Sequence, residues 1–153
     1  MQILKNVIFV CMTMCMLVGL TACKNNEKYE LTAWKSLATI AVTYDQTMST
    51  LGDLHTNGKI SDETAQKAID FGHKFTPLYL AAVESLEVFV KNPADDKVDV
   101  VRNAIQAAMD SLDLFVEFAN SFGVNKTDSA KEMVTDENAK IVAKHAAATL
   151  QGE

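Results

Sequence analysis

Few residues of the sequence could ligate a metal ion or act as acid-base catalysts, and their spacing matches no known site of either kind. The three histidines are His55, His73 and His145. Asp70 and His73 would lie on one face of a helix, one turn apart, where both could ligate a metal ion. The Glu-x-x-His pairs of a di-iron bundle and the Cys-x-x-Cys-His sequence of haem attachment are both missing from the sequence. We therefore expect no metal and no cofactor.

Catalytic motifs are not found either. Serines, histidines and aspartates occur throughout the chain, but no nucleophile elbow groups them. No glycine-rich loop of the kind that cradles phosphate is present. The expectation from the sequence is that the protein is not an enzyme.

The N-terminal segment is typical of an export signal. Residues 1–6 hold one lysine, Lys5, and residues 7–20 form an apolar run of 14 residues without a charge. A helix needs about 20 apolar residues to cross the hydrocarbon core of a bilayer, so this run is too short to span one. Its length is that of the apolar region of a signal peptide.

The residues that follow this run are Leu20, Thr21, Ala22 and Cys23. An apolar residue, two small residues and a cysteine at this distance from the N-terminus resemble the lipobox of bacterial lipoproteins. The resemblance implies that Cys23 receives a diacylglyceryl group and that the chain is cut just before it. It also implies that Leu20 enters an apolar pocket of the signal peptidase, while Thr21 and Ala22 fit a narrow cleft. The alternatives are a simple membrane anchor, or an ordinary secretory signal with a chance cysteine.

The resemblance also predicts where the protein is located. Fatty acyl chains such as palmitate would anchor it to a membrane of the cell envelope. Lys24 follows the lipidated cysteine, whereas in Gram-negative lipoproteins an aspartate there favours retention in the inner membrane. We therefore expect the protein in the envelope, at the periplasm, with the outer membrane as its anchoring membrane if the source is Gram-negative. The polar residues 24–30 would form a tether of at most about 23 Å.

Composition agrees with a folded, exported domain. Cys11 and Cys15 lie within the signal, so the mature part has no thiol besides Cys23 and no internal disulfide. That part carries 13 basic and 20 acidic residues, a net charge of −7. Nucleic acid would repel such a chain, so we expect no nucleic-acid partner.

Apolar residues recur at steps of three and four in the first half of the mature chain, which predicts two helices. The first spans about 30–56 and ends at Asn57-Gly58, since glycine readily closes a helix. The second starts after Ser61, an N-cap, and runs to about Lys91 with a kink at Pro77. The inward residues expected for the first helix are Leu31, Trp34, Leu37, Ala41, Tyr44, Met48 and Leu51. Those expected for the second are Ala65, Ala68 or Ile69, Gly72, Phe75, Tyr79, Ala82 or Val83, Leu86 and Phe89.

The second half predicts one strong helix and one weak one. The strong helix starts at Asn92-Pro93 and stops at Gly123. The weak helix covers about 129–150, with Ser129 and Glu132 at capping-box spacing or with residues 135–137 as its true start. The inward residues expected for the strong helix are Val98, Val101, Ile105, Ala108, Leu112, Phe115, Ala119 and Phe122. Those expected for the weak helix are Met133, Val134, Ile141, Val142 and Leu150.

These elements predict an all-α fold. Signals for strands are nearly missing, and the short connections favour an antiparallel up-down bundle of three long helices with a weaker fourth. The expected organisation is a signal peptide at 1–22, a lipidated cysteine and polar tether at 23–30, and a helical bundle domain at 31–153.

Three functions fit these features. The first is a non-enzymatic, lipid-anchored envelope module that binds another envelope protein or gives structural support. A second is a carrier of a small apolar ligand between the helices, although aromatic residues at helical spacing are more often core. A third is an exclusion or immunity lipoprotein of phage or plasmid type.

Overall fold

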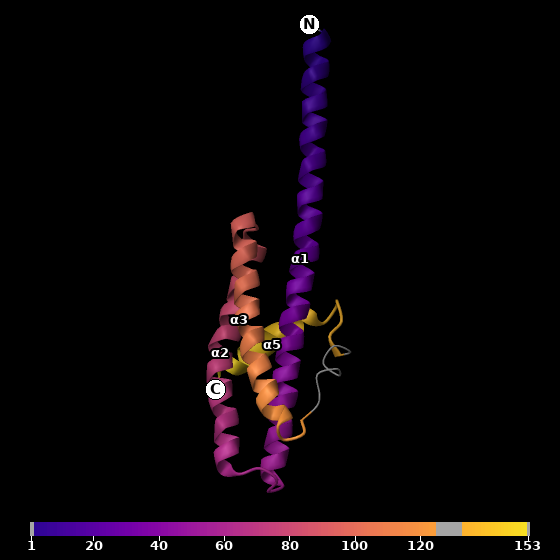
Figure 1. Ribbon diagram of the computed structural model, residues 1–153. Coiled ribbons are helices and arrows are strands. Elements are labelled where there is room, and N and C mark those ends of the chain that lie inside the picture. Colours follow the sequence, from indigo (N-terminus) through magenta and orange to yellow (C-terminus); the bar gives the residue numbers. More distant parts are fainter. Residues whose placement is uncertain (1, 125–132, 153) are drawn as a thin grey trace. The chain divides into compact units, whose positions relative to one another are not determined.

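The computed structural model describes the backbone of residues 2–124 and 133–152, and the side chains of those residues from Asn26 onward. The chain divides into two compact units, 1–30 and 31–153. The helices are α1 (Gln2–Thr56), α2 (Asp62–Lys91), α3 (Asp95–Asn120) and α5 (Ala139–Gln151), as Figure 1 shows. The described residues contain no β-strand.

The second unit is a helical bundle, and the predicted fold class is confirmed. Short connections after Thr56 and Lys91 reverse the chain, so α2 is antiparallel to both α1 and α3 (Figure 1). Helix α5 packs on the first two helices as a shorter fourth member. Within the described residues, no helix has an apolar stretch long enough to cross a membrane.

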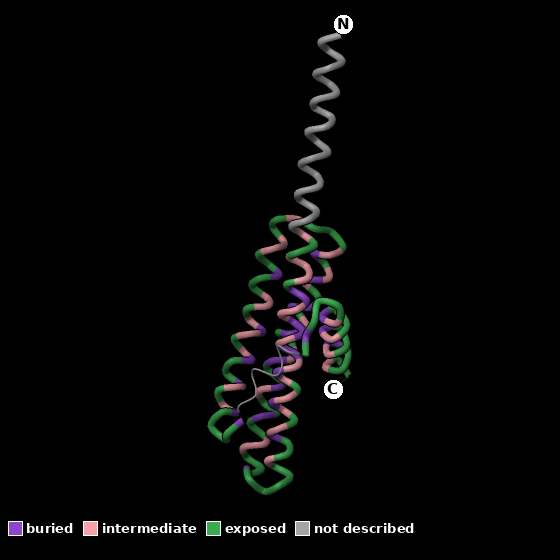
Figure 2. Tube along the Cα trace, turned by 90° about the vertical axis from the view of Figure 1, so that its right-hand side faces the viewer, coloured by how far each residue is buried: buried purple, intermediate pink, exposed green. Residues whose placement is uncertain are grey.

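The interior is built from the apolar face of each helix, and Figure 2 shows buried residues repeating along them. The positions predicted to be buried in α2 are confirmed almost residue by residue. Of the pairs left open, Ala68 faces the interior while Ile69 is 43% exposed, and both Ala82 and Val83 are buried. The largest fully buried side chains are Tyr79, Phe75, Phe89, Phe115, Leu37, Leu51, Leu86 and Val101.

The first connection forms as its sequence predicts. Gly58 adopts a left-handed φ of 67°, which closes α1 at little steric cost. Ser61 caps α2, and its hydroxyl oxygen accepts a hydrogen bond from the backbone N–H of Thr64 at 3.3 Å. Helix α2 then continues through Pro77.

The predicted start of α3 is wrong. The backbone N–H of Asn92 donates to the carbonyl oxygen of Val88, so Asn92 ends α2 and does not cap α3. Helix α3 begins at Asp95, after an extended Ala94 that makes no side-chain cap hydrogen bond. The predicted stop is confirmed, because Gly123 has a φ of 83° just beyond Asn120.

Helix α5 differs from its prediction in the residue at which it starts and in the face that it buries. Ser129 and Glu132 lie outside the described residues. The backbone N–H of Asn138 donates to the Thr135 hydroxyl at 3.3 Å, and that of Thr135 donates to the Asn138 side-chain oxygen at 2.8 Å. This reciprocal pair precedes α5, close to the alternative start at 135–137.

The residues that α5 buries are smaller than those predicted. Ala139, Ala143 and Ala147 face the interior, whereas Ile141 is 71% exposed and Met133 is 55% exposed. Those two inward assignments are wrong, because close packing against the bundle selects the alanine stripe. Phe122 is likewise 36% exposed, since it lies past the end of α3.

Helix α1 starts far earlier than the predicted position near residue 30. Residues 24–30, the predicted polar tether, are helical. No glycine or proline occurs between Gly19 and Gly52 to interrupt the helix.

Candidate functional site

The sequence-predicted lipidation site lies in the first unit. Leu20, Thr21, Ala22 and Cys23 belong to α1 by their backbone. Their side chains lie outside what the structure describes, so lipidation at Cys23 stays a prediction.

The three histidines lie apart. The Nε2 atom of His55, in the last turn of α1, lies 2.8 Å from Oδ1 of Asp62 in the first turn of α2. His73 is exposed, and the carboxylate of Asp70 accepts a hydrogen bond from Gln66 at 3.3 Å. His145 is exposed on α5. The described residues bring together no group of three or more His, Cys, Asp or Glu side chains that could hold a metal ion.

Aromatic rings from three helices fill the centre of the bundle. The rings of Tyr44 and Phe75 stack at 4.3 Å between centroids and 14° between planes. Phe75 also stacks on Tyr79 at 5.5 Å, and Tyr44 meets Phe115 of α3 at 5.6 Å. Such contacts add to the area that each ring buries. The rings of Tyr44, Phe75, Tyr79 and Phe115 therefore meet one another in the core.

Tyr79 links α2 to two other helices. Its hydroxyl lies 3.3 Å from the carbonyl oxygen of Leu37 in α1 and 3.1 Å from that of Ala143 in α5. The side chain is fully buried, and burial raises the pKa of Tyr79 well above its ordinary value. The hydroxyl therefore stays neutral and serves as a donor shared between two carbonyls.

We expect Tyr79→Phe to lower the free energy of unfolding by about 1 kcal/mol. The ring and its packing are retained, and both carbonyls belong to helices that offer them other partners, so only the shared hydrogen bond is lost. Urea denaturation followed by circular dichroism measures the change. An unchanged midpoint would show that the hydroxyl contributes nothing to the joining of these helices.

Charged side chains surround the contact between α5 and the rest of the bundle. The Nζ atoms of Lys140 and Lys144 lie 5.7 and 5.8 Å from the centre of the Trp34 ring. Lys144 also pairs with Glu87 of α2 at 2.5 Å, and its hydrogen bond lowers the pKa of that carboxyl. Lys35 of α1 pairs with Asp136 at 2.7 Å. These groups are partly exposed, so each pair adds little stability but helps to orient α5.

A groove of about 590 Å³ lies between α1 and α3. Its walls mix hydroxyl groups with apolar side chains such as Ile40 and Leu112. The hydroxyls of Ser36 and Thr39 donate back to the carbonyl oxygens of Thr32 and Lys35. These two hydroxyls therefore have partners within their own helix.

A second surface lies where α2 and α3 face solvent, and we name it the α2/α3 face. Four large apolar side chains on it are exposed: Leu78 by 37%, Val88 by 48%, Val100 by 57% and Leu114 by 60%. Smaller residues continue the same two lines at helical spacing. The face comprises Leu78, Ala81, Ser85 and Val88 of α2 with Val100, Ala104, Ala107, Ser111 and Leu114 of α3.

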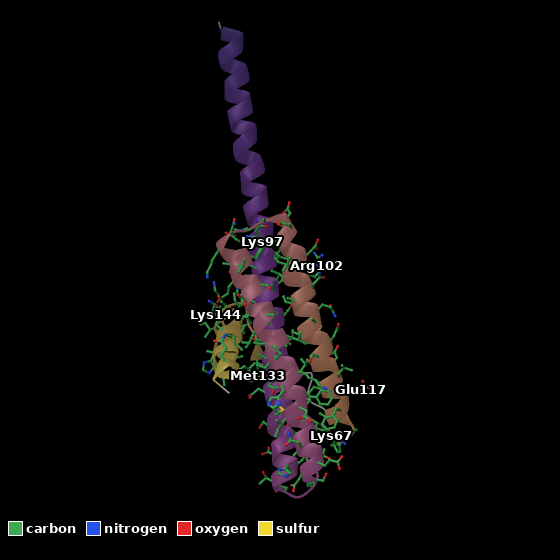
Figure 3. All side chains as sticks on the ribbon, turned by 90° about the vertical axis from the view of Figure 1, so that its left-hand side faces the viewer. Lys67, Lys97, Arg102, Glu117, Met133 and Lys144 are labelled. Atoms are coloured by element: carbon green, nitrogen blue, oxygen red, sulfur yellow. The ribbon has the colours of Figure 1, made fainter. Side chains whose placement is uncertain are left out.

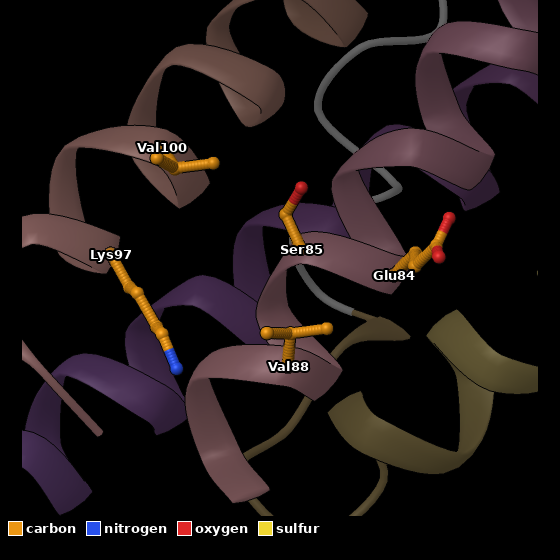
Figure 4. Close-up of a pocket in the computed structure, with 5 residues that line it drawn as sticks. All are labelled: Glu84, Ser85, Val88, Lys97 and Val100. Carbon is orange, nitrogen blue, oxygen red and sulfur yellow. The ribbon is translucent and has the colours of Figure 1, made fainter. Parts of the chain in front are cut away.

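Near the turn between α2 and α3 the α2/α3 face is hollowed. A pocket of about 200 Å³ is lined by Glu84, Ser85, Val88, Lys97 and Val100 (Figure 4). This surface was not predicted from the sequence, because the larger apolar residues indicate only the inward face of each helix. The detectable signal was a second series at steps of three and four, offset from the first.

Comparison with protein-family models, with curated proteins and with solved structures finds no match to this chain.

Proposed function

We propose that this chain is the precursor of a lipid-anchored lipoprotein of the cell envelope, whose helical domain is a non-enzymatic binding or structural module. The observation that carries the anchor is the series Leu20, Thr21, Ala22 and Cys23 directly after an uncharged apolar run of 14 residues. Cys23 would carry the acyl chains and residues 1–22 would be removed. Lys24 favours the outer membrane if the cell is Gram-negative.

Lipidation at Cys23 would hold the protein firmly. Each buried methylene contributes about 0.8 kcal/mol, and a single acyl chain gives only marginal binding, whereas two or three chains hold durably. The eight residues 23–30 rise only about 12 Å when helical. The anchored domain would therefore remain near the bilayer surface.

Two properties of the domain support a role in binding another protein. Its charge of −7 disfavours nucleic acid and anionic lipid headgroups as partners. The α2/α3 face exposes four large apolar side chains in two adjacent lines. Exposed apolar side chains that gather on one face of a domain mark an interaction site.

Intact-mass spectrometry of the protein purified from membranes tests the anchor. We expect a chain that begins at residue 23 and carries added acyl mass, and we expect Cys23→Ala to abolish both the cleavage and the added mass. The matched control is Cys15→Ala, which changes a cysteine of the apolar run and should leave the mature mass as in the wild type. A wild-type chain without acyl mass, or one that keeps residues 1–22, would refute the lipoprotein proposal.

A further inference from the structure

The proposed binding function leaves the partner open, and the following inference rests on it. We infer that the α2/α3 face binds an amphipathic helix of a partner protein, with lysines or arginines on both sides of its apolar edge.

The shape of the face fits a helix. Val100 and Leu114 are 14 residues apart on α3, so they point in nearly the same direction and lie about 21 Å apart along the helix. Leu78 and Val88 form the second line, on α2. Between these side chains the face carries small residues, Ala107 of α3 among them. This spacing, with large side chains at the ends and small ones at the centre, suits the apolar edge of a partner helix.

The border of the face is acidic. Asp110 lies one turn from both Ala107 and Leu114, and Glu117 lies one turn beyond Leu114. On the α2 side, Glu84 borders the pocket. All three carboxylates are exposed, and Figure 3 shows Glu117 near the C-terminal end of α3, with Lys97 near its N-terminal end.

Two basic side chains also lie near the face, fewer than the three carboxylates at its border. The Nζ atom of Lys97 donates to the carbonyl oxygen of Asn92 at 3.0 Å. That of Lys74 lies 5.8 Å from the centre of the Phe71 ring. Charge complementarity therefore favours a basic partner, whereas a second copy of this acidic domain would bring like charges together.

Photo-crosslinking of the full chain in its native cells tests the inference. Benzoylphenylalanine replaces Val100 or Leu114 on the face, Ser36 in the groove between α1 and α3, or Ile141 on α5. We expect adducts with another protein at Val100 and Leu114 but not at Ile141. Sequencing of the adduct should find apolar residues at steps of three and four, with lysine or arginine on both sides.

The charge requirement has its own variants. Replacing both Asp110 and Glu117 by Lys should reduce the adduct at Val100 by about 5- to 10-fold, because two charge pairs with the partner become repulsive. The matched control replaces Asp45 and Asp53, exposed acids of α1, by Lys and should leave the adduct unchanged. Circular dichroism verifies that every variant folds.

Other outcomes separate the inference from the proposed function. Adducts at Ser36 or Ile141 alone would overturn the inference and leave a binding module in place. Adducts at the face that contain a second copy of this chain, a lipid or an acidic segment would also overturn it. Adducts at none of the four positions would count against both.

Discussion

Phe75→Ala should lower the free energy of unfolding by about 3 to 5 kcal/mol, which is the usual cost of deleting a fully buried phenyl ring. Phe75 has no exposed surface and lies between two rings, 4.3 Å from that of Tyr44 and 5.5 Å from that of Tyr79. Three helices hold the surrounding backbone, so the cavity cannot close fully. Since domains of this size are stable by only about 5 to 15 kcal/mol, the loss is a large fraction of the total.

Urea denaturation of the mature protein measures this loss. The matched control is Leu114→Ala, which removes a large apolar side chain that is 60% exposed and should change stability by less than about 0.5 kcal/mol. A loss below about 1 kcal/mol for Phe75→Ala would contradict the stacked arrangement of the three rings.

Gly72→Ala should destabilise the protein by about 1 to 3 kcal/mol, although alanine is the better helix former. A Cβ atom at residue 72 would lie only 2.5 Å from the hydroxyl oxygen of Tyr44. The Tyr44 ring cannot move away freely, because it stacks on Phe75. The cause is overpacking between α1 and α2. The denaturant concentration at the midpoint of unfolding measures the loss of stability.

Two further variants isolate this contact. Gly52→Ala, on α1, meets nothing within 4 Å and should stabilise the helix by about 0.5 to 1 kcal/mol. In a Tyr44→Phe background the colliding oxygen is gone, so Gly72→Ala should become neutral or stabilising. If Gly72→Ala has the same effect in both backgrounds, the close approach to the Tyr44 hydroxyl is not its cause.

The sequence predicts the long helices well because each buries one continuous face. In α2 the series Gly72, Phe75, Tyr79 and Leu86 keeps the helical period, and every member is buried. The ends that depend on local chemistry, at Ser61 and Gly123, are likewise where the sequence places them. Period and capping act over a few residues, so a single sequence contains them.

Features that depend on tertiary contact could not be predicted in this way. Asn92 could either end one helix or cap the next. Its backbone hydrogen bond to the carbonyl oxygen of Val88 shows that it ends α2. In α5 the isoleucine at 141 suggested an inward face, yet the helix packs on the bundle through its alanines. The hydrogen bonds of Tyr79 join residues far apart in sequence, and no local pattern indicates them.

The two candidate sites also differ in whether local sequence or tertiary contact defines them. The lipobox is a linear signal, so residues 20–23 suffice to predict lipidation at Cys23. The α2/α3 face is formed by two helices together. In the sequence its valines and leucines look like core residues, and only the packing of the helices shows that they are exposed.

Trp34 is the single tryptophan of the chain and is only 2% exposed. Two lysines of α5 lie over its ring, so its surroundings depend on a helix that adheres mainly through alanines. The tryptophan fluorescence of the protein therefore reports whether the C-terminal helix is docked. Departure of that helix would hydrate the indole and shift its emission to longer wavelength while most of the bundle remained folded.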